Sequence, residues 1–93
     1  MLEKELAQYI AELDAAASAC TRAEDRHMYQ SHLAEAARMF VALSSAEPLA
    51  QVLPLVESEA HGYGWGFLSG SSGEKAEAAF QKFADIVRGA IAT

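Results

Sequence analysis

Two histidines and a carboxylate near the middle of the chain are residue types that could bind a divalent metal ion. Glu57 and His61 are four residues apart, so they share one face if this segment is helical. If that helix folds back at Ser45 onto the preceding helix, His32 and Glu35 lie at about the same level. Imidazole nitrogens and carboxylate oxygens are ligands for ions such as zinc. The sequence therefore suggests a metal site at His32, Glu57 and His61.

A solvated polar helix face accounts for the same residues without a metal. The helical phases place His32 only at the edge of the apolar stripe, and they place Glu35 and His61 outside it. Exposed charged side chains at such spacings form weak ion pairs. No nucleophile stands in a recognisable catalytic motif, so we expect no catalytic residue and no cofactor. Metal or small-ligand binding stays the alternative function.

A run of aromatic residues and glycines between positions 61 and 70 is the second candidate site. Tryptophan is enriched where proteins bind partners, and a face of glycines lets another backbone approach closely. The predicted partner-binding surface consists of Gly62, Tyr63, Trp65, Gly66 and Phe67. The competing interpretation is that Trp65 packs over the end of the fold as a lid.

Helices must position these side chains, because apolar residues recur at steps of three and four along most of the chain. The first stripe predicts a helix over about residues 2–19. The second runs through Tyr29, Leu33, Ala36, Phe40 and Leu43 and ends near Leu43 or Ser44. The third stripe starts at Leu49, and the fourth predicts a helix over about residues 72–91 that buries one row: Ala76, Phe80, Phe83, Ala84, Val87 and Ile91.

Start and stop signals refine these boundaries. Thr21 with Glu24 forms a capping-box spacing at the start of the second helix, and Ser71 with Glu74 repeats it at the last. Ser44 and Ser45 can cap the third helix, with Pro48 in its first turn.

The third helix contains two interruptions. Pro54 predicts a kink or a restart, because proline removes one backbone hydrogen bond. For residues 62–70 a glycine-rich loop and a continued helix are both open. We favour the helix, because the aromatic and glycine spacings persist through the segment, with Gly70 as its C-cap.

Length and composition bound the class of protein. The 93 residues suit one domain, 1–93, and 52% of them are hydrophobic. Much of that fraction is alanine, which buries little area, so a single chain has a thin core and gains from pairing as a homodimer. The net charge of −6 argues against nucleic acid as a partner. No apolar run is long enough for a membrane span, and the single cysteine suits a reducing cytoplasm.

These patterns predict an all-α fold, an up-down four-helix bundle, with a homodimer of helical hairpins as the alternative. The expected function is a small, non-enzymatic protein-interaction or regulatory module that self-associates. We expect it to be cytoplasmic, with a protein or itself as partner and with neither nucleic acid nor membrane.

Overall fold

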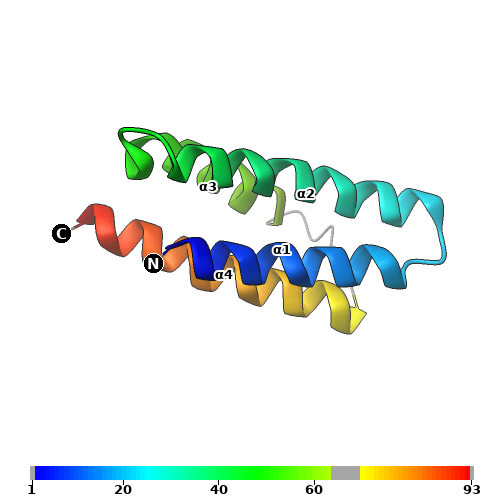
Figure 1. Cartoon of the computed structure of the whole chain (residues 1–93). Helices are drawn as coiled ribbons and strands as arrows, with labels where there is room; N and C mark the ends of the chain where they lie inside the picture. The colour runs from blue at the N-terminus through cyan, green and yellow to red at the C-terminus, as the bar shows by residue number, and fades with distance from the viewer. Residues whose placement is uncertain (1, 64–69, 93) are drawn as a thin grey trace.

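The computed structural model of the chain describes residues 2–63 and 70–92, and these residues form four α-helices (Figure 1). The helices are α1 (Leu2–Ala19), α2 (Ala23–Leu43), α3 (Pro48–Tyr63) and α4 (Gly70–Ala92). No strand occurs in this described part of the chain. The all-α prediction is therefore confirmed.

The helices pack as a bundle in which each helix lies beside its neighbours in the chain and α4 returns to α1 (Figure 1). The molecule measures 41 × 20 × 19 Å, so its long dimension follows the helix axes. The predicted helical bundle is confirmed. The up-down order of all four helices and the homodimer stay predictions.

The first helix forms where the sequence predicts it, because its apolar residues return to one face every three or four positions. Its buried side chains are Leu6, Tyr9, Leu13, Ala16 and Ala17. They enter one core with the buried residues of the other helices, which include Val52, Val56, Phe80 and Phe83.

The buried stripe of α2 differs from the predicted one. Met39 is fully buried, whereas Phe40 is 39% exposed. His32 is buried, whereas Leu33 is only partly so. Positions 32 and 39 lie about 100° around the helix from positions 33 and 40, and both rows contain residues that could pack. The position of α3 beside α2 decides between the two rows, and the sequence of α2 alone does not contain that information.

The predicted capping box at Thr21 is wrong. The residue that precedes α2 is Arg22, in an extended conformation with no side-chain cap hydrogen bond. Glu24 instead accepts from the Arg22 guanidinium, with 2.8 Å between Nη2 and Oε2. Glu24 therefore forms an ion pair with Arg22 instead of the hydrogen bond of a capping box.

The two serines after α2 also act differently from the prediction. The Ser45 hydroxyl donates to the carbonyl oxygen of Ala42 at 2.7 Å, and the Ser44 hydroxyl donates to that of Phe40 at 3.5 Å. Both serines therefore satisfy carbonyl groups at the end of α2 rather than starting α3. Pro48 is the first residue of α3, where its missing N–H costs no helical hydrogen bond.

The third helix runs through Pro54 as one element, so the predicted restart does not occur. It ends at Tyr63. The predicted continuation beyond Tyr63 falls mostly on residues 64–69, which lie outside the described residues. Gly70 begins α4 rather than capping α3, and Ser71 lies inside α4 rather than before it. These two cap predictions are therefore wrong.

Within residues 2–63 and 70–92, none of the helices combines the length and the apolarity that crossing a bilayer requires.

Candidate functional site

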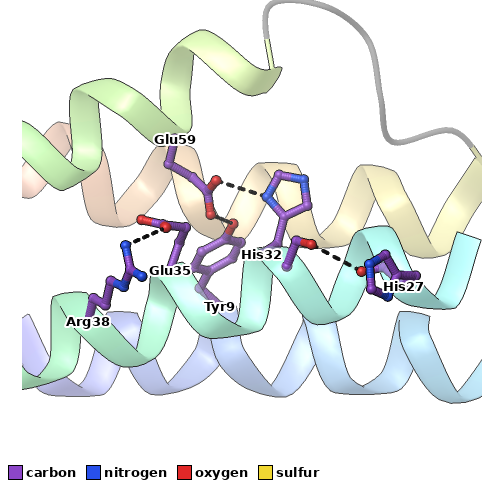
Figure 2. A network of polar contacts seen from close by, with 7 residues as sticks. Tyr9, His27, His32, Glu35, Arg38 and Glu59 are labelled. Carbon is purple, nitrogen blue, oxygen red and sulfur yellow. Dashed lines mark hydrogen bonds and ion pairs between the residues drawn. The ribbon is translucent and has the colours of Figure 1, made fainter.

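The strongest concentration of polar chemistry in the core is a network of three side chains from three helices (Figure 2). The Tyr9 hydroxyl of α1 donates to Oε2 of Glu59 on α3, with 2.8 Å between the oxygens. The other carboxylate oxygen, Oε1, lies 2.9 Å from Nδ1 of His32 on α2. We call Tyr9, His32 and Glu59 the buried network.

Helical periodicity delivers all three side chains to the core. Tyr9 lies between the buried positions 6 and 13 of α1, and His32 lies between the buried positions 29 and 36 of α2. Glu59 follows the buried Val52 and Val56 at the same spacing. Tyr9 is fully buried, and His32 and Glu59 are 8% and 6% exposed.

The Tyr9 ring also contributes apolar packing. Its centroid lies 5.2 Å from that of Phe80 on α4, with the rings tilted by 51°. This geometry falls in the range that aromatic pairs prefer. Tyr9 therefore contacts the fourth helix with its ring while its hydroxyl bonds to the third.

The buried network is built to satisfy a carboxylate. Taking Glu59 out of water is expensive unless its oxygens find partners, and each of them has one. His32 adds charge attraction in its protonated form, and it donates from Nδ1 both in that form and in the neutral tautomer that carries its proton on Nδ1. The arrangement ties α1, α2 and α3 together and encloses the polar groups, which suits a structural role better than contact with a substrate.

The structure does not bring the three predicted metal ligands together. His32 belongs to the buried network, and His61 is exposed near the end of α3. Glu57 is two residues before Glu59, so it lies about 200° around the helix from it. No group of three or more histidine, cysteine, aspartate or glutamate side chains among the described residues could hold a metal ion.

Glu57 and Glu35 have other partners instead. Glu57 accepts from the Arg88 guanidinium of α4, with 2.9 Å between Nε and Oε1, and this hydrogen bond raises the pKa of Arg88. Glu35 pairs with Arg38 on α2 itself at 3.1 Å (Figure 2). Both pairs are partly exposed, so they resemble the solvated ion pairs of the alternative interpretation.

The predicted partner-binding surface is described only at its start. Gly62 and Tyr63 are the last two residues of α3, whereas Trp65, Gly66 and Phe67 lie outside the described residues. A Cβ atom added to Gly62 would meet no heavy atom within 4 Å. A close approach of a neighbouring helix within the described structure therefore does not require the glycine at position 62.

Glu59 is the residue of the buried network that the sequence analysis does not single out. Its spacing from Val52 and Val56 places it on the buried face, and that signal is present in the sequence. A carboxylate in an apolar stripe becomes informative only when its partners are known, and Tyr9 and His32 lie 50 and 27 residues away.

Large apolar side chains remain exposed near the C-terminal ends of α2 and α4, which lie at the same end of the bundle (Figure 1). Phe40 is 39% exposed, Val41 is 74% exposed and Ile91 is 42% exposed. The described parts of α2 and α4 make no close backbone contact with each other, so these residues lie on separate helices at one end of the bundle, and we call the three of them the apolar end group.

The exposure of Ile91 corrects its predicted place in the core. The α1 and α4 helices run in opposite directions, and Tyr9 faces Phe80. By helical register Leu2, the first residue of α1, then lies near the level of Val87. Ile91 is one turn farther along α4, beyond the start of α1.

No family model, no curated protein and no solved structure matches this chain.

Proposed function

We propose that this chain is a small, non-enzymatic helical module that binds protein, and that its partner is a second copy of itself. The exposed apolar end group is the observation that carries this proposal. Leaving large apolar side chains in water is unfavourable, and covering them with a second copy recovers that free energy.

The composition of the core supports the same proposal. Among the described residues, six of the seventeen buried hydrophobic residues are alanines, at positions 16, 17, 36, 42, 76 and 84. Alanine buries less apolar area than leucine or phenylalanine. A chain of this size gains stability by burying further apolar surface in an oligomer.

The buried network suits a structural role rather than a catalytic one. Its polar atoms bond to one another inside the bundle, and its three residues are nearly closed to solvent. The predicted surface from Gly62 to Phe67 stays part of the proposal as a second candidate interface, because tryptophan is favoured in protein interfaces.

Solution mass, measured by light scattering after size exclusion, tests self-association. A monomer has a mass of 10.0 kDa, so a dimer has twice that mass. The informative variants are Val41→Lys, which puts a charge into the apolar end group, and Trp65→Ala. Ala34→Lys is the matched control, because it is exposed on the same face of α2 seven residues earlier.

Each pattern of masses has a distinct meaning. A wild-type dimer that becomes monomeric in Val41→Lys but not in Ala34→Lys places the interface at the apolar end group. Loss of the dimer in Trp65→Ala alone places it on the glycine and aromatic segment. A monomeric wild type at all accessible concentrations refutes self-association.

A further inference from the structure

A small hollow lies in the seam between α1 and α4, away from the buried network. Lys4, Glu5 and Gln8 line it from α1, and Ala79 and Lys82 line it from α4. Its volume is about 100 Å³. Glu5 is half-buried, and its Oε2 atom is shielded from solvent without a hydrogen-bond partner among the described residues. A shielded carboxylate oxygen is unfavourable until a donor reaches it.

The lining presents two acceptors and two cations. Glu5 contributes its carboxylate group, in which the shielded Oε2 atom has no hydrogen-bond partner among the described residues. Gln8 uses its amide nitrogen to donate to Glu12 at 3.0 Å, which leaves the side-chain oxygen as the Gln8 atom that can accept. Lys4 and Lys82 are exposed residues that both line the hollow, one from each helix.

This arrangement complements a compact molecule with a positive donor at one end and a negative acceptor at the other. A volume of about 100 Å³ holds roughly three water molecules, or an organic molecule of similar size. We propose that the hollow binds a small zwitterionic α-amino acid. Its ammonium group donates to Glu5 and Gln8, and its carboxylate meets Lys4 and Lys82. The site shares no residue with the proposed self-association surfaces, so either proposal can fail without the other.

Titration of the ¹⁵N-labelled protein with glycine, followed by NMR, tests this site. We expect saturable shifts of the backbone amides of Glu5, Gln8, Ala79 and Lys82, with a dissociation constant on the order of 1 mM for so small a ligand. Acetate and methylammonium each satisfy only one half of the lining. Both should bind at least about tenfold more weakly than glycine.

Two pairs of variants locate the binding. Glu5→Gln keeps the shape and removes the charge, so glycine affinity should fall about tenfold, and Lys82→Gln should weaken it similarly from the other helix. Glu74→Gln and Lys75→Gln are matched controls on an exposed part of α4, and they should bind glycine as the wild type does.

Three results would overturn the proposal. The wild type could show no saturable shift at tens of millimolar glycine, in which case water fills the hollow. Glu5→Gln could bind glycine with wild-type affinity, which would show that the ammonium group of glycine does not bind Glu5. Acetate could bind as tightly as glycine, which would make the site a simple anion site of the two lysines.

Discussion

Replacing Glu59 with alanine should destabilise the protein more than any other single removal of a charged side chain. The change removes the acceptor of the Tyr9 hydroxyl and the carboxylate that faces His32, both inside the core. Burying a donor that has lost its acceptor costs about 1–3 kcal/mol, so the two losses together cost roughly 2–6 kcal/mol. A domain of this size has a free energy of unfolding of roughly 5–14 kcal/mol, so the effect is a large fraction of the total.

Urea denaturation followed by circular dichroism measures this effect, with Glu57→Ala as the matched control. Glu57 is two residues away on the same helix and pairs with Arg88 at the partly exposed surface. Such a pair is worth about 0–1 kcal/mol. Equal losses in the two variants, or a loss below about 1 kcal/mol for Glu59→Ala, would refute the energetic role of the buried network.

A triple variant, Tyr9→Phe with His32→Leu and Glu59→Leu, tests whether the hydrogen bonds of the buried network outweigh the free energy of burying its polar groups. Replacing a whole buried polar cluster with apolar side chains of similar volume is often neutral or stabilising. We therefore expect the triple variant to recover most of the stability that Glu59→Ala loses. A triple variant less stable than Glu59→Ala would show that the network itself contributes net stability.

Three further outcomes follow from the same structure. Burial, with smaller contributions from Cys20 and Asp25, raises the pKa of Tyr29 above 10. Tyr29 therefore ionises at lower pH in the unfolded chain than in the folded protein. The stability that neutral Tyr29 contributes is complete below pH 10 and is lost as the pH rises through the folded pKa. A tyrosinate absorbance titration of the wild type, compared with Tyr29→Phe, detects the raised pKa. Equimolar zinc should leave the melting temperature of the wild type and of His61→Ala unchanged, because the predicted ligands are not together. Phe80→Ala should cost roughly 3–5 kcal/mol in urea denaturation and Phe40→Ala much less, because Phe80 is fully buried and Phe40 is not.

The sequence was sufficient for those parts of the fold that local periodicity encodes. The bounds of α1 match the predicted range, and the row of α4 from Ala76 to Val87 is buried as predicted. Both helices have a single clear apolar row, so the face that packs can be predicted from the sequence of each helix alone. In α2 two adjacent rows compete, and only the position of α3 selects His32 and Met39 over Leu33 and Phe40.

The candidate site was harder to predict, because it depends on contacts between helices. The sequence marks His32 as a candidate ligand and predicts Glu57 and His61 beside it, whereas its observed partner is Glu59. Side chains two residues apart on a helix point about 200° away from each other. A small error in the predicted helical phase therefore assigns the wrong residue of α3 as the partner. The shielded Oε2 atom of Glu5 is likewise visible only when α4 lies against α1.

The polar contacts of α3 explain why a partner surface would lie elsewhere. Glu59 fixes the inner face of this helix to α1 and α2, and Glu57 joins another face to Arg88 of α4. These charged groups are already matched within the chain, so a second copy gains little by competing for them. Phe40, Val41 and Ile91 have apolar area that the chain itself leaves exposed. Covering that area involves no loss of internal ion pairs, and this difference in cost favours the apolar end group as the contact between copies.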